Sequence, residues 1–164
     1  LYYIKDLINK IKVLMAEPSE FRSVLLNPQE VLKFWPQFEE DIEKALEHSV
    51  MELTAFDICK QALSGVIHIW LTLDNNNKIV CTTTTRFLNY PSHKALQIIT
   101  CTGKDRKWDE FYEQHKAIED FAKQSNCSGI QVWGRKGWQR QLKKLTNDVG
   151  KQYETQYYVY NMEI

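Results

Sequence analysis

The chain has 164 residues, 43% of them hydrophobic, so it is long enough to bury one core but short for two typical domains. Lysine plus arginine and aspartate plus glutamate both total 21, and zero net charge excludes a protein that binds nucleic acid through bulk charge. No stretch approaches the roughly 20 apolar residues that cross a bilayer, which excludes a transmembrane helix.

Residues 1–15 are predicted to form an amphipathic helix, as an N-terminal extension over 1–19. The apolar residues recur at helical spacing: Ile4, Leu7, Ile8, Ile11 and Leu14. Charged residues interrupt them, so the segment lacks the apolar middle of a signal peptide. Monomers avoid an apolar stripe left in water, so we expect the helix to pack on its own domain or on another chain. A membrane-surface helix is the alternative.

Residues 20–164 are predicted to form a single domain. It opens with a short apolar strand over 21–26, and a helix follows. Asn27 can cap that helix, Pro28 suits its first turn, and Glu30 can complete a capping box. These local signals place the beginning of the helix at Asn27.

Pro36 lies inside the apolar pattern of that helix and is expected to kink it or split it in two. A second capping box, Thr54 with Asp57, predicts a short helix that ends near Ser64. The other elements follow in chain order: strands over 66–73, 78–87 and 95–101, a helix from near Lys107, a strand over 130–133, a helix over 137–145 and a final strand over 153–160. This order predicts an α/β (α+β) fold with a mixed, mostly antiparallel bent sheet flanked by helices. The two strands on either side of the long helix should run parallel.

The turn after strand 130–133 carries the most distinctive segment of the chain. Gly134 and Gly137 bracket Arg135 and Lys136, and a basic amphipathic helix follows at once. The glycines are expected to supply the backbone freedom that the turn requires. The cations form either a solvated face or a nucleic-acid contact, and zero net charge favours the solvated face.

This segment resembles part of a known family. It matches the GR-x-GW-x-x-x-L segment of GNAT-like proteins encoded by tailed bacteriophages, with Leu142 as the last residue. Asn126-Cys127 stands where those proteins have a GC-like step at the end of the preceding helix. The element order over residues 20–160 resembles the GNAT fold of acetyl-CoA-dependent N-acetyltransferases. The resemblance implies acetyl transfer from acetyl-CoA to an unidentified amine.

The resemblance also implies where coenzyme A binds, namely a notch between strands 95–101 and 130–133. The implied cofactor-binding residues are Cys101, Thr102, Gly103, Lys104, Asp105, Arg106, Lys107 and Arg135. The chain departs from the family in this loop. Family members carry several glycines there, whereas this chain has Gly103 alone, and Asp105 would repel phosphate.

The catalytic residues of the family are also thinly represented. Strands 78–87 and 95–101 contain no Asp or Glu, and helix 137–145 has no tyrosine to serve as the acid. The candidate bases are His68 and His93, and an ordinary structural role is the alternative for each. The alternative function is therefore a catalytically inactive GNAT-fold component of a phage virion or its assembly, acting through protein contacts.

The cysteines indicate the redox state of the compartment in which the protein works. The four cysteines are widely spaced, without a C-x-x-C pair, so we expect reduced thiols and no metal site: Cys59, Cys81, Cys101 and Cys127. The expected location is the host cytoplasm or the virion, neither secreted nor membrane-spanning. The expected partners are an amine substrate or virion proteins, without membrane or nucleic acid, and an oligomer formed through the N-terminal helix.

Overall fold

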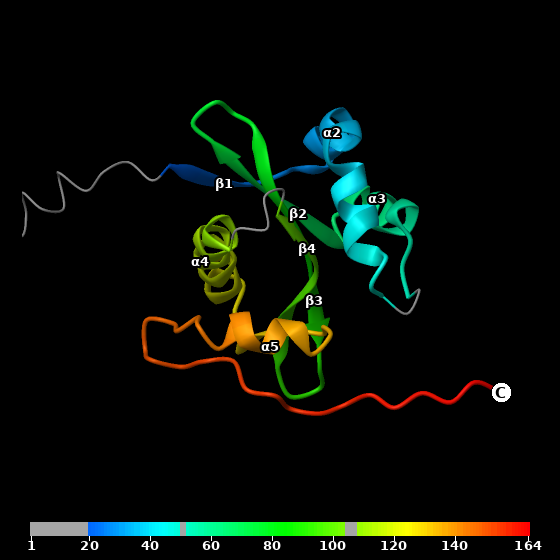
Figure 1. The fold of residues 1–164 in the computed structure, drawn as a ribbon, viewed down its shortest axis with the longest axis vertical. Coiled ribbons are helices and arrows are strands. Elements are labelled where there is room, and N and C mark those ends of the chain that lie inside the picture. Colours follow the sequence, from blue (N-terminus) through cyan, green and yellow to red (C-terminus); the bar gives the residue numbers. More distant parts are fainter. Residues whose placement is uncertain (1–19, 50–51, 104–107) are drawn as a thin grey trace, which may run out of the picture.

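The computed structural model describes residues 20–49, 52–103 and 108–164. The helix predicted over 1–15 lies outside these residues. The elements, labelled in Figure 1, are β1 (Phe21–Leu25), α2 (Pro28–Leu46), α3 (Ala55–Leu63), β2 (Ile67–Asp74), β3 (Ile79–Asn89), β4 (Lys94–Gly103), α4 (Asp109–Gln124), β5 (Gly129–Val132) and α5 (Gly137–Leu142).

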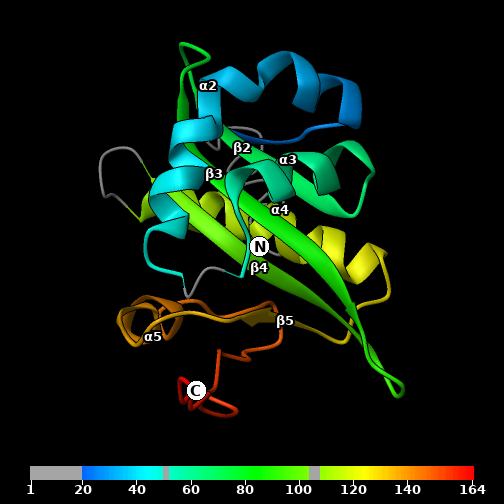
Figure 2. The same cartoon turned by 90° about the vertical axis from the view of Figure 1, so that its right-hand side faces the viewer.

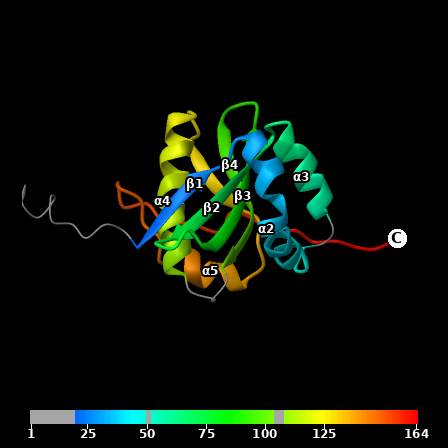
Figure 3. The ribbon, with the colours of Figure 1, turned by 90° about the horizontal axis from the view of Figure 1, so that it is seen from above.

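The five strands form one sheet in chain order, β1-β2-β3-β4-β5. The first four are antiparallel to their neighbours, and β5 runs parallel to β4 after the crossover through α4. Seen from above, α4 covers one face of the sheet and α2 and α3 cover the other (Figure 3). This architecture confirms the predicted mixed, mostly antiparallel sheet flanked by helices.

Local capping signals place the start of α2 where the sequence predicts it. The Asn27 Oδ1 accepts from the Glu30 N–H at 2.9 Å, and the Glu30 Oε2 accepts from the Asn27 N–H at 2.8 Å. Pro36 does not split the helix, which runs unbroken to Leu46. Pro36 is solvent-exposed, so the carbonyl that loses its helical partner lies on the wet side of α2, where water can satisfy it.

Each face of the sheet carries its own apolar core. Phe38 and Ile58 centre the core under α2 and α3, while Phe111 and Ile118 anchor the core under α4. Between the two cores lies the run Thr82–Thr85 on β3, with every member at most 1% exposed. The centre of the sheet is therefore polar, and these buried hydroxyls need hydrogen-bond partners.

The predicted strand over 153–160 is wrong. After α5 the chain makes one isolated bridge, between Thr146 and Gln152, and residues 153–164 carry no regular structure. In Figure 1 this tail runs past α5 and away from the sheet. A period-two pattern makes a strand only when another strand lies beside it, and among the described residues no strand pairs with the tail.

The helix predicted over 137–145 ends three residues early. The Lys144 N–H donates to the Gln141 carbonyl, and the Leu145 N–H donates to the Leu142 carbonyl. Both bonds span three residues, so the last turn tightens and leaves the α-helical path.

Candidate functional site: the notch between β4 and β5

The carboxyl ends of β4 and β5 separate. The two strands pair only between Ala95–Ile98 and Gly129–Val132, while β4 continues to Gly103. Figure 2 shows β5 and α5 below the long β3–β4 pair. In the part of the chain that the structure describes, no backbone bond joins Ile99–Gly103 to β5 or to the segment after it. The end of β4 thus presents a free backbone edge to a notch.

A β-bulge marks the point where the strands separate. Thr84 pairs with Thr100 and Thr85 pairs with Ile98, so Ile99 is an extra residue on β4. A bulge leaves its extra residue outside the ladder and bends the strand. Ile99 is therefore both the extra residue of the bulge and the first residue of β4 beyond its pairing with β5.

The predicted phosphate loop is described only in part. Cys101, Thr102 and Gly103 are the last residues of β4 and are half-buried, whereas Lys104, Asp105, Arg106 and Lys107 lie outside the described residues. Beyond the loop, Trp108 stands at the N-cap of α4, and among the described residues no side chain caps the first N–H groups of the helix. The first turn of α4 also carries Asp109 and Glu110, whose charges oppose an anion there.

Arg135 is exposed on the turn between β5 and α5. Three residues later the Trp138 ring packs edge-on against Trp108, with centroids 5.2 Å apart, and against Phe111 at 5.5 Å. Trp108 directly follows the predicted phosphate loop. The tryptophan contact therefore brings the turn that carries Arg135 to the same end of the sheet as that loop.

The glycines of this turn do not have the role expected of them. Neither Gly134 nor Gly137 has a positive φ. A Cβ on Gly137 would meet nothing within 4 Å, whereas a Cβ on Gly134 would lie 2.9 Å from the Trp138 Cδ1. Gly134 is needed because Trp138 packs on its backbone, and the expectation of special backbone freedom at Gly137 is wrong.

His68 is a packed histidine on β2. Its Nδ1 lies 3.1 Å from the Thr85 Oγ1, which also accepts from the Trp70 Nε1 at 3.0 Å. Its ring meets Phe87 and Phe121 edge-on. Burial, and secondarily Lys94, lowers the pKa of His68, so the imidazole is held neutral among aromatic rings. β2 is separated from β4 by β3, so His68 does not border the notch.

His93 lies in the β3–β4 turn, just before β4 begins. It is exposed, stacks on Tyr90 with centroids 4.7 Å apart, and has its Nδ1 3.0 Å from the Ser92 Oγ. β4 is ten residues long from Lys94 to Gly103, which is roughly 30 Å of strand. The structure therefore does not bring His93 together with the predicted phosphate loop.

A buried carboxyl near the notch is absent from the sequence-based candidates. Asp41 on α2 is only 5% exposed, and its Oδ2 accepts from the Thr82 Oγ1 at 3.1 Å. Its backbone carbonyl accepts from the Thr102 Oγ1 at 2.6 Å. The available signal was its position, because Asp41 follows Phe38 by three residues and precedes Ala45 by four, within the apolar stripe of the helix.

Comparison with known proteins identifies the fold. No protein-family profile and no curated protein matches the chain. Solved structures do match it, among them an aminoglycoside acetyltransferase from an uncultured soil metagenomic sample, meta-AAC0020, with a TM-score of 0.63, 14% identity, and coverage of 88% of this chain and 97% of that one. The chain has a GNAT-like fold.

Two further structures show the same likeness. The ribosomal-protein-alanine N-acetyltransferase of Brucella melitensis biovar Abortus 2308 matches with a TM-score of 0.61 and 12% identity, over 87% of this chain and 99% of that one. A predicted acetyltransferase of Clostridium acetobutylicum with acetyl-CoA matches with a TM-score of 0.59 and 12% identity, over 86% of this chain and 96% of that one. At these identities the likeness establishes the GNAT-like fold alone.

Elsewhere in the described residues the candidate ligand sites are weaker than the notch. A shallow apolar depression is lined by residues of α3 and the residue after it: Phe56, Cys59, Lys60, Leu63 and Ser64. It has no convergent polar groups of the kind that orient a ligand. Within the described residues no group of three or more His, Cys, Asp or Glu side chains could hold a metal, and no helix is long and apolar enough to cross a membrane.

Proposed function

We propose that this chain binds acetyl-CoA in the notch between β4 and β5 and transfers the acetyl group to an amine, as a phage-type N-acetyltransferase. The observation that carries the proposal is the free backbone edge of Ile99–Gly103, which begins where a bulge releases peptide groups. An extended ligand that contains amides can hydrogen-bond to such an edge as a strand would. The pantetheine arm of coenzyme A is a ligand of this kind.

The described residues fit coenzyme A in two respects and oppose it in one. The edge of β4 suits the amide-bearing arm, and Arg135 supplies a cation at the phosphate end. Asp109 and Glu110 work against the phosphates. Bound acetyl-CoA supplies an acetyl group activated as a thioester. The chain offers the N–H groups of the Ile99 bulge as donors to the carbonyl oxygen that gains charge during attack.

Proton transfer is where this chain differs from a general-base enzyme. The described strands that border the notch offer hydroxyls and no carboxylate, and His68 is held in an aromatic cluster away from the notch. The nearby Asp41 carboxylate is buried and already accepts from the Thr82 hydroxyl, so we expect the acceptor amine to arrive unprotonated. The rate should rise with pH up to the pKa of the acceptor's own amine, and that upper limit should move when a different acceptor is used.

Calorimetry with coenzyme A tests the cofactor step. We expect Arg135→Glu to weaken binding about tenfold or more, because it replaces an attraction to phosphate with a repulsion. The matched control is Lys78→Glu on the exposed β2–β3 turn, which should leave affinity within about twofold. Absence of binding heat for the unaltered chain would contradict the proposal.

The second candidate function is a GNAT-fold component of a virion or its assembly that has lost catalysis. The observation that favours it is the lack of an acid–base pair beside the notch in the described residues. Free-thiol release from acetyl-CoA, measured with a panel of amines, separates the candidates. Coenzyme A binding without thiol release above the buffer rate would favour the inactive component.

A further inference from the structure

We propose that Cys81 and Cys101 form an oxidation site, which a peroxide closes into a disulfide between β3 and β4 and a dithiol reopens. Their sulfur atoms lie 3.8 Å apart in the reduced chain. Both thiols are free, as are those of Cys59 and Cys127. The inference goes beyond acetyl transfer, and it does not require that coenzyme A binds.

The register of the sheet brings the two thiols together. Cys81 lies opposite Gly103, and Thr83 lies opposite Cys101, so the two cysteines are diagonal neighbours across the β3–β4 pair. Both side chains lie on the face that α4 covers, where they pack in the same core cluster. Diagonal neighbours on one face of a sheet are within reach of each other's side chains. The contact between the thiols is therefore built into the pairing of the strands.

The two thiols differ in exposure, which sets the order in which they react. Cys81 is 0% exposed, whereas Cys101 is half-buried near the end of β4, where in the described residues β5 no longer pairs with the strand. The hydrogen bond with Cys101 and, secondarily, burial raise the pKa of the Cys81 thiol. Cys101 is therefore the sulfur that a peroxide reaches, and Cys81 is the thiol that reacts with the product.

The chemistry takes two steps. Hydrogen peroxide transfers one oxygen atom to the Cys101 sulfur, which becomes a sulfenic acid, and the rest of the peroxide leaves as water. The Cys81 sulfur then bonds to the Cys101 sulfur and displaces its hydroxyl group, which leaves as water with the proton of the Cys81 thiol. The two thiols lose two electrons in total, and the peroxide gains them.

Closure must move the end of β4. The Cα atoms of diagonal neighbours are roughly 7–8 Å apart, whereas a disulfide joins Cα atoms about 4.4–6.8 Å apart. The segment of β4 after Ile98 can move toward β3, because in the described part of the chain no β5 partner holds it. Oxidation therefore displaces the strand end that borders the notch.

Gln114 on α4 favours the reduced pair. The Cys81 thiol donates to the Gln114 Oε1 at 3.7 Å, and the Gln114 side chain is fully buried. Its Nε2 already has no hydrogen-bond partner among the described residues. A disulfide has no S–H, so closure takes the donor from the Oε1 as well, and a buried amide without partners is costly. Reopening by a dithiol restores that hydrogen bond.

Thiol counting on the full chain tests the inference. One equivalent of hydrogen peroxide should lower the count, taken after unfolding, from four thiols to two, and should make the chain two hydrogen atoms lighter. A digest should contain residues 81 and 101 in one linked peptide, and dithiothreitol should restore all four thiols. Cys59→Ser and Cys127→Ser are the matched controls, since Cys59 lies on α3 and Cys127 packs in a different cluster. Each should still lose two thiols.

Single substitutions separate the two roles. Cys81→Ser should form no internal disulfide, and its Cys101 should accumulate a sulfenic acid that dimedone traps. Cys101→Ser, at the half-buried position, should keep Cys81 as a thiol because the remaining sulfur is shielded. A treated chain that keeps four thiols overturns the proposal. A disulfide that includes Cys59 or Cys127 overturns it as well.

The role of Gln114 is tested in a fixed mixture of reduced and oxidised glutathione. Gln114→Leu should raise the ratio of disulfide to dithiol about threefold or more, because no buried amide then loses a donor. Gln124→Leu, at an exposed position of the same helix, is the matched control and should leave the ratio unchanged. Equal ratios for Gln114→Leu and the parent chain would overturn this account of the reopening.

Discussion

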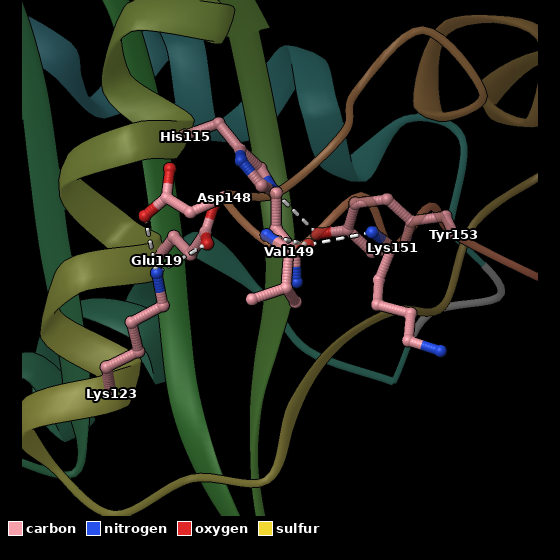
Figure 4. A network of polar contacts seen from close by, with 8 residues as sticks. His115, Glu119, Lys123, Asp148, Val149, Lys151 and Tyr153 are labelled. Atoms are coloured by element: carbon pink, nitrogen blue, oxygen red, sulfur yellow. Dashed lines mark hydrogen bonds and ion pairs between the residues drawn. The ribbon is translucent and has the colours of Figure 1, made fainter.

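Tyr153 and His115 form the polar contact that fixes the start of the C-terminal tail. Both side chains are largely buried, and burial lowers the pKa of His115 and raises the pKa of Tyr153. Both groups are therefore neutral, and a single proton joins the Oη and the Nε2 at 2.7 Å. Figure 4 shows this pair beside the surface ion pairs that Lys123 makes with Glu119 and Asp148. The pair with Asp148 is exposed and contributes little to stability, so the buried Tyr153–His115 contact is the stronger polar link between α4 and the end of the chain.

The two buried histidines predict how stability depends on pH. His68 and His115 both have a folded-state pKa below the unfolded value of about 6.5. Below that pH the unfolded chain takes up protons that the folded chain does not, so the free energy of unfolding should fall as pH falls and be fully present above about pH 6.5.

Urea denaturation at about pH 7.5 and 5.5 measures this change. The variant His68→Gln, His115→Gln should show a smaller difference between the two pH values. Because acidic groups titrate mainly below this window, equal slopes for the variant and the parent chain would assign the pH dependence to other groups.

The two glycines of the β5–α5 turn predict opposite effects of the same substitution. Gly134→Ala forces a methyl group against Trp138, so it should lower the free energy of unfolding by about 1–3 kcal/mol. Gly137→Ala fills open space at the first position of α5 and should raise it by about 0.4–1 kcal/mol. Chemical denaturation of both variants checks the pair, and equal effects would mean that contact with Trp138 is not what distinguishes them.

At the scale of elements, α2 keeps a proline in its interior. Pro36 removes one helical hydrogen bond on the exposed side of the helix. We expect Pro36→Ala to stabilise the chain by about 1–3 kcal/mol, since the regained bond exceeds the entropy that proline removes from the unfolded chain. The melting temperature should rise accordingly. Gln37→Ala, at the adjacent exposed position, is the control that should change little.

Elements with local signals were predictable from the sequence, and those that depend on distant partners were not. The capping boxes at Asn27 and Thr54 fix where α2 and α3 begin, because every atom involved lies within four residues. The segment 153–160 has a pattern of the same quality, but a strand requires a neighbour, and the pattern carries no information about whether another strand lies beside it.

The notch at the end of β4 was predictable from the sequence only through the likeness to a family. The position of Gly103 relative to the parallel strands follows from the element order, whereas the bulge at Ile99 has no signature within the run from Ala95 to Cys101. The contact between Asp41 and Thr82 spans 41 residues, so no local pattern could pair them.

At the scale of the whole molecule, ligand binding should be visible as stability. If coenzyme A binds only the folded chain, a concentration one hundred times its dissociation constant adds about 2.7 kcal/mol to the free energy of unfolding. For a chain of this size the melting temperature should rise by about 5–11 °C. Differential scanning fluorimetry checks this, with adenosine as a control for the nucleoside alone. A rise of equal size with adenosine would place recognition at the base rather than along β4.

The four consecutive threonines of β3 have a consequence for how the register of the sheet is fixed. A strand of identical residues presents the same side chains to both faces after a slip of one position, so Thr82–Thr85 cannot distinguish one alignment from the next. The register is therefore set by the partners of these threonines. Asp41 accepts a hydrogen bond from Thr82, Trp70 donates one to Thr85, and the Ile99 bulge shifts the pairing with β4 between Thr84 and Thr85. The central strand of this molecule is therefore positioned from outside, by a helix on one face and an indole on the other.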